Sequence, residues 1–88
     1  MHGIITVVGT DQVGIIAKVS AFLSEKNINI EDISQTILSG NFVMMMMVEL
    51  NKSQDLEALK KDLAIIGEAM HVSISLMHEG VFSAMHRI

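Results

Sequence analysis

Cysteine, proline, tryptophan and tyrosine are all absent from this 88-residue sequence. Without cysteine the chain has no disulfides, no thiolate zinc site and no cysteine nucleophile. Basic residues are also scarce, since six Lys and Arg stand against ten Asp and Glu, which gives a net charge of −4. This balance argues against nucleic acid or an anionic membrane as a partner, because both favour clustered Lys and Arg.

Long hydrophobic runs are lacking as well. The longest uninterrupted apolar run covers residues 42–48, far short of the roughly 20 residues that a membrane-spanning helix needs. The segment from Met1 to Ile4 has neither the basic region nor the cleavage site of a signal peptide. We therefore expect a soluble, cytoplasmic protein without a membrane partner.

Hydrophobic residues, by contrast, are abundant: they make up 50% of the chain, and only 18% of the residues are charged. The length allows one small domain. Ordering a chain costs roughly 1.5 kcal/mol per residue, so a core of this size leaves little net stability. We therefore expect part of the apolar surface to be buried against a second copy of the chain.

The hydrophobic periodicity predicts six elements: strands over residues 4–8, 28–38, 42–50 and 72–76, and helices over residues 15–26 and 56–70. The order is βαββαβ. Right-handed crossovers then place both helices on one face of a four-stranded antiparallel sheet, which is the α+β, ferredoxin-like sandwich. We expect residues 1–79 to form this domain, and residues 80–88 to form a C-terminal tail that packs on the sheet or on a dimer partner.

Several local features are predicted within these elements. The first helix buries Ile16, Val19 and Leu23, and Asn27 ends it in the left-handed conformation. A change of hydrophobic parity at Glu31 in the second strand indicates a β-bulge. Either Asn51 with Gln54, or Ser53, caps the second helix. The sheet face away from the helices is expected to present apolar side chains from two strands, namely Ile5, Val7, Val43, Met45 and Met47.

The loop over residues 9–14 is the candidate functional feature, because it leads into the first turn of a helix. Free N–H groups and the positive dipole end there can hold a carboxylate. Gly14 allows a ligand to approach the backbone closely, and Asp11 can accept hydrogen bonds from an ammonium group. Together they suit the two ends of a free amino acid. In the structural alternative, Asp11 only caps the helix and Gly14 only permits the turn.

Two short motifs resemble those of the ACT domain family. One is D-x-x-G-[IV] at Asp11-Gln12-Val13-Gly14-Ile15, and the other is N-I-x-x-I at Asn29-Ile30-Glu31-Asp32-Ile33. The resemblance covers essentially the whole chain, and residues 82–88 resemble the ending of a small group of stand-alone ACT proteins. It implies a regulatory module that binds an amino acid or similar metabolite at a domain interface, through residues at six positions: Asp11, Gln12, Val13, Gly14, Ile15 and Asn29. Gly9 and Asp11 replace the His and Asn of the serine-binding type, so serine itself is not implied.

The predicted crossover also bears on assembly. The helix between the first two strands spans roughly 18 Å at 1.5 Å per residue, so Asp11 and Asn29 should lie at opposite ends of one sheet. They can meet when two copies pair their second strands antiparallel, and a twofold homodimer of this kind has two equivalent sites.

Other functions are weighed against this one. A protein-interaction adapter would use the apolar sheet face and need no ligand. No nucleophile–base pair or acid–base pair is evident, so neither an enzyme nor a cofactor is predicted. Four histidines show no short metal-ligand spacing, and no metal site is predicted from them: His2, His71, His78 and His86. Consecutive strand residues point to opposite faces, so the methionines at 44–47 cannot converge on one ion.

Overall fold

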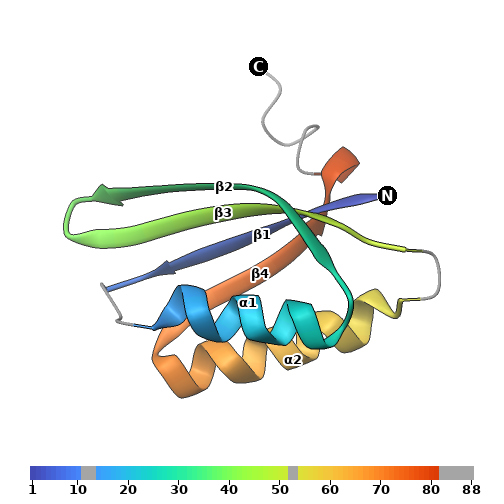
Figure 1. Ribbon diagram of the computed structural model, residues 1–88. Coiled ribbons are helices and arrows are strands. Elements are labelled where there is room, and N and C mark those ends of the chain that lie inside the picture. Colours follow the sequence, from blue (N-terminus) through green and yellow to red (C-terminus); the bar gives the residue numbers. More distant parts are fainter. Residues whose placement is uncertain (11–13, 52–53, 82–88) are drawn as a thin grey trace.

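The computed structural model describes residues 1–10, 14–51 and 54–81. It contains six elements, in the order β1 (His2–Gly9), α1 (Ile15–Glu25), β2 (Asn29–Leu38), β3 (Asn41–Glu49), α2 (Leu56–Met70) and β4 (Val72–His78). The strands form one sheet in the order β2-β3-β1-β4, with antiparallel neighbours throughout. Both helices cover the same face of this sheet (Figure 1). The predicted ferredoxin-like sandwich is confirmed.

The core lies between the sheet and the helices. Its fully buried side chains include Met44, Met46 and Val48 from the central strand β3, and Val19 and Leu23 from α1. Because side chains alternate along a strand, Met45, Met47 and Glu49 point to the opposite side. We call that side the helix-free face.

The prediction of which β1 side chains face the helices was wrong. Ile5 and Val7 were expected on the helix-free face, but they are 1% and 0% exposed and belong to the core, opposite Met46 and Met44. Ile4 occupies the helix-free face instead, opposite Met47. The expected positions of Val43, Met45 and Met47 agree with the strand alternation, and all three side chains are half-buried.

The ends of α1 agree with the prediction more closely than its buried residues do. Ile15 is buried, whereas Ile16, which was expected in the core, is 37% exposed. Asn27 has a φ of 58°, and the N–H of Ile28 donates to the Leu23 carbonyl at 2.9 Å. This is a Schellman motif, and it directs the chain from α1 into β2.

The helix α2 begins with a different cap from the two predicted. Asp55 is its N-cap, and its carboxylate accepts hydrogen bonds from the N–H groups of Glu57 and Ala58. The interaction predicted between Asn51 and Gln54 exists, with a distance of 2.9 Å from the Asn51 nitrogen to Gln54 Oε1, but it precedes the helix. Ser53, the other predicted cap, lies outside the described residues.

Two irregularities shape β2 and β3. Ser39 and Gly40 both have positive φ, 54° and 79°, so they join the two strands through a type I′ turn. The register shifts between Ile30 and Asp32, which makes Glu31 the bulged residue and confirms the predicted β-bulge.

At the other end of the chain, β4 continues into a helical turn at residues 79–81 (Figure 1), where Val81 is 51% exposed. Residues 82–88 lie outside the described residues, so the packing of the C-terminal tail stays a prediction. Neither α1 nor α2 combines the length and the apolar character of a membrane-crossing helix, and no other helix of the described residues does so.

Candidate functional site

The start of α1 forms one half of the predicted ligand site. Gly14 is the N-cap, with a φ of 90° and a ψ of 0°, in the left-handed region that favours glycine. Apart from its two chain neighbours, no described residue has an atom within 4 Å of the place that a Cβ would take here, so these residues leave the backbone open to an approaching molecule. Gly14 offers no side chain to cap the first-turn N–H groups, which are the donors that a carboxylate can use.

Ile15 takes a different part from the one its place in the motif suggests. Its side chain is only 2% exposed and packs in the core, so only its backbone can face a ligand. The remaining predicted residues of this loop lie outside the described residues, namely Asp11, Gln12 and Val13.

Asn29 forms the other half of the predicted site, and the structure keeps it away from the first. It is the first residue of β2 and is exposed. The 11-residue helix α1, about 16 Å long at 1.5 Å per residue, separates it from Gly14 (Figure 1). Within one copy, therefore, Gly14 and Ile15 lie together at the start of α1, and Asn29 lies beyond its other end.

β2 is an edge strand with an unusually open surface. It has a neighbour on one side only, and every residue in it except the half-buried Ile30 is exposed. Three of the exposed residues are large and apolar: Ile33 at 40%, Ile37 at 63% and Leu38 at 64%. An exposed edge of this kind is a template for pairing with a strand of another chain.

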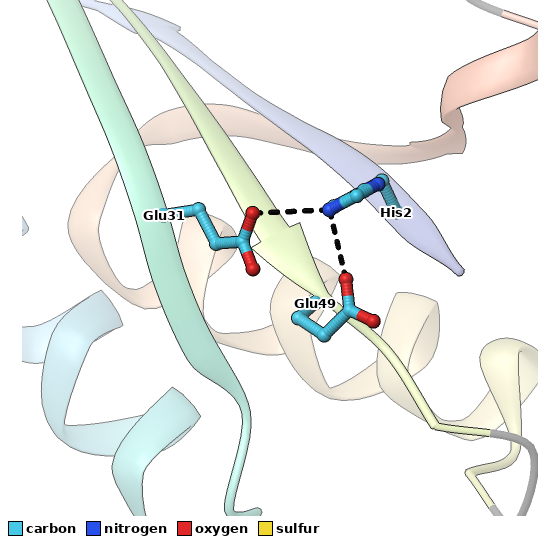
Figure 2. A group of neighbouring side chains, drawn as sticks. All are labelled: His2, Glu31 and Glu49. Carbon is cyan, nitrogen blue, oxygen red and sulfur yellow. Dashed lines mark hydrogen bonds and ion pairs between the residues drawn. The ribbon is translucent and has the colours of Figure 1, made fainter.

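A second group of polar side chains gathers at the end of the sheet near the N-terminus. His2, Glu31 and Glu49 come from β1, β2 and β3, and their side chains point toward one another (Figure 2). His2 Nε2 lies 3.0 Å from Glu31 Oε1 and 2.8 Å from Glu49 Oε2. The other oxygen of Glu49, Oε1, lies 3.3 Å from the Met1 ammonium. We call His2, Glu31 and Glu49 the His–Glu cluster; an imidazole and two carboxylates are groups that can hold a metal ion.

The strand register explains how residues so far apart in sequence meet. His2 lies directly opposite Glu49 in the β1–β3 ladder. Glu31 is the bulged residue of β2, beside the part of β3 that ends in Glu49. A bulge can re-aim a side chain, and here it turns Glu31 toward its two partners.

The His–Glu cluster was not predicted, because the four histidines show no short metal-ligand spacing in the sequence. The partners of His2 are carboxylates 29 and 47 positions away, which no local motif reveals. The parity change at Glu31 was the available signal, since bulges are frequent next to functional sites.

A shallow hollow of about 210 Å³ also lies on the helix-free face. Residues of all three strands β1, β2 and β3 line it: Ile4, Asp32, Ser34, Met45, Met46 and Met47. It lies near the His–Glu cluster, because Ile4 and Met47 are two positions along the strands from His2 and Glu49.

Comparison with known proteins agrees with this architecture. The UPF0237 protein YjhC of Lactococcus lactis subsp. lactis is 47% identical over 88 residues, which are 100% of both chains. The solved structure of an ACT domain protein from Streptococcus pneumoniae superposes with a TM-score of 0.84 at 41% identity, covering 98% of each chain.

A formyltetrahydrofolate deformylase from Pseudomonas syringae pv. tomato contains the same fold, with a TM-score of 0.77 at 27% identity. The match covers 88% of this chain but 27% of the deformylase, so the fold also occurs as part of a larger protein. The family model of the ACT domain matches residues 2–76. The chain therefore belongs to the ACT domain family.

Proposed function

We propose that this protein is a regulatory module that binds an amino acid, or a similar small zwitterion, between the two subunits of a homodimer. Asp11, Gln12, Val13, Gly14 and Ile15 of one copy would face Asn29 of the other. The proposal includes no catalytic activity and places the protein in the cytoplasm. Membership of the ACT family supports it, because ACT domains generally bind small molecules such as amino acids.

The observation that carries the proposal is the open backbone at Gly14. At this left-handed N-cap, directly before the first turn of α1, the described residues beyond its chain neighbours leave free the space that a side chain would otherwise take. A ligand carboxylate at this point would accept hydrogen bonds from the first-turn N–H groups and interact favourably with the helix dipole.

The strand register supports the proposal that a second copy contributes Asn29 to the site. Gly9, at the end of β1, lies opposite Phe42, which in turn lies opposite Ile37 near the end of β2. The loop that follows Gly9 is therefore level with the far end of β2. If a second β2 pairs antiparallel along this edge, its first residue, Asn29, arrives at that level. A twofold axis between the strands would make the two sites equivalent.

Thermal-shift measurements with each of the twenty amino acids test the proposal. A ligand that binds only the folded state stabilises it by about 2.7 kcal/mol at a concentration of 100 times Kd. We expect one amino acid or a small related group to raise the melting temperature, and Asn29→Ala to abolish the shift. If no amino acid raises it, the proposed function is wrong.

The helix-free face supports one alternative function. Val43, Met45 and Met47 are half-buried side chains there, beside the 210 Å³ hollow, and flexible Met side chains suit adaptable protein contacts. This favours an adapter that binds another protein and needs no ligand. The same thermal-shift screen separates the two functions, because only the ligand-binding module responds to a small molecule.

A further inference from the structure

We propose that the His–Glu cluster is a binding site for a divalent transition-metal ion, with Zn²⁺ as the expected occupant. His2 would supply an imidazole nitrogen, and Glu31 and Glu49 one carboxylate oxygen each. The site lies at the start of β1 and is separate from the proposed small-molecule site at Gly14.

The first argument is the convergence of ligand atoms. One atom from each residue lies within 4.8 Å of the other two, and two of the separations are 3.0 and 2.8 Å. Zinc bonds to nitrogen and oxygen are about 2.0–2.2 Å long, so ligand atoms around one tetrahedral ion stand about 3.2–3.6 Å apart. A small outward shift of partly exposed side chains is therefore enough to admit the ion.

The second argument is an unsatisfied oxygen. His2 Nε2 carries at most one proton, and its hydrogen bond goes to Glu31 Oε1. Glu49 Oε2 has almost no exposure to solvent and accepts no hydrogen bond from the described residues, although it lies 2.8 Å from the same nitrogen. A buried oxygen without a donor is costly. A cation placed between the three atoms would bind this oxygen and, in the tautomer with the ring proton on Nδ1, the Nε2 lone pair as well.

The third argument is charge. Two carboxylates facing a neutral imidazole leave two negative charges at one point of the sheet. The Met1 ammonium lies 3.3 Å from Glu49 Oε1 and offsets one of these two charges. A divalent ion would supply positive charge in contact with both carboxylates. In the competing arrangement, an imidazolium and the Met1 ammonium together balance the two carboxylates, but a single Nε2 proton still serves two oxygens.

The donor set indicates the class of metal. One imidazole with two carboxylates suits first-row divalent ions such as Zn²⁺, and the chain has no cysteine to favour softer metals. Three protein ligands leave a fourth tetrahedral position for water or an added molecule. The strand backbone positions the ligands: His2 and Glu49 are paired with each other, and Glu31 is the bulged residue between two paired residues of β2.

Titration of Zn²⁺ into chelator-treated protein, followed by isothermal calorimetry, tests the proposal. The tag is placed at the C-terminus and removed, so that Met1 and His2 remain as they are. We expect one Zn²⁺ per chain, and binding at least about tenfold weaker in both Glu31→Gln and His2→Gln. The visible spectrum of bound Co²⁺ should show the intense absorption of a four-coordinate ion, and Glu31→Gln should reduce it.

Two control variants make the test specific. Asp32→Asn removes the carboxylate next to Glu31, and His71→Gln removes an exposed imidazole outside the cluster; both should bind Zn²⁺ like the unaltered protein. Circular dichroism confirms that each variant is folded. Absence of stoichiometric binding would overturn the proposal, and so would equal losses in Glu31→Gln and Asp32→Asn, which would indicate diffuse surface binding. Neither result depends on whether an amino acid binds at Gly14.

Discussion

Asn29 lies directly opposite Glu49 in the β2–β3 ladder. The first residue belongs to the proposed amino-acid site and the second to the proposed metal site, so both sites use the same end of β2. Asn29 would act on a ligand held by a second copy, whereas Glu49 acts with His2 and Glu31 of its own copy. Substitutions should therefore be able to abolish binding at one proposed site without affecting the other.

We predict that Asn29→Ala abolishes the thermal shift caused by the amino acid but leaves the Zn²⁺ affinity unchanged. The Asn29 side chain is exposed and is not one of the three residues of the His–Glu cluster. Glu31→Gln should have the reverse effect, because it removes a metal ligand and leaves both Asn29 and Gly14 in place. Calorimetry and thermal shift on the same protein samples measure both effects. Loss of both activities in either variant would contradict the separation.

Gly14→Val provides a test of the open backbone at the start of α1. Since φ is 90°, any side chain there is strained, and we expect a stability loss of about 1–2 kcal/mol in urea denaturation. The branched side chain would also fill the space through which a ligand reaches the first-turn N–H groups. The ligand-induced thermal shift should therefore disappear.

The matched control for Gly14→Val is Gly40→Val. Gly40 has a φ of 79° and, as at Gly14, no described residue beyond its chain neighbours comes within 4 Å of the place that a Cβ would take. It should lose a similar amount of stability but keep the ligand response. If Gly14→Val retains full ligand affinity, the ligand binds elsewhere.

The fold was predictable because each element carries its own signal in the sequence. Val72 to Leu76 alternates between apolar and polar residues, and β4 has one covered face accordingly. The parity change at Glu31 likewise predicted the bulge. The face assignment of β1 failed because residues 4–8 are nearly all β-branched and apolar. The odd-numbered and even-numbered residues therefore look equally suited to the core. Only pairing with β3 decides that Ile5 and Val7 enter the core.

The candidate sites were predictable to different degrees. Gly14 and Asn29 were proposed as site residues from local motifs, and their separation within one copy followed from the length of one helix. The His–Glu cluster was not recognisable, since it depends on the register of three strands and on the direction in which a bulge turns Glu31. Asp55 was missed as a cap because several polar residues precede α2 and the sequence does not show where its first turn begins.

The methionine run gives a prediction that tests the strand alternation. Met46 is 0% exposed and faces the helices, whereas Met45 is half-buried on the helix-free face. Met46→Ala should lower the free energy of unfolding by about 2–5 kcal/mol, because it leaves a cavity in a closed core. Met45→Ala should cost clearly less, since its surroundings are partly open. Equal losses in urea denaturation would show that both faces of β3 are equally covered.

Gly67 in α2 is predicted to be intolerant of even one added methyl group. A Cβ there would come within 2.7 Å of the Val72 carbonyl oxygen, which is backbone and cannot move aside cheaply. Overpacking costs about 1–3 kcal/mol, against a gain of about 1 kcal/mol from replacing Gly in a helix. We expect Gly67→Ala to lower the melting temperature. Glu68→Ala, at an exposed neighbouring position, should change stability by no more than about 0.5 kcal/mol.

The edge strand β2 gives the test of the dimer. Ile37 is 63% exposed near the end of this strand, where a second copy of β2 would cover it. Ile37→Lys should place a charge in the proposed interface while leaving the core unchanged. We expect a dimer for the unaltered protein and a monomer for the variant in sedimentation experiments at micromolar concentration. Circular dichroism should show the same secondary structure in both.

Ile65→Lys is the matched control, because Ile65 is 60% exposed but lies on α2, away from the edge of the sheet. It removes the same apolar side chain and adds the same charge, so solubility and net charge change alike in both variants. A dimer in Ile65→Lys and a monomer in Ile37→Lys would assign the interface to β2. If Ile37→Lys also remains a dimer, the copies associate through another surface, and Asn29 of one copy cannot complete the site at Gly14 of the other by this pairing.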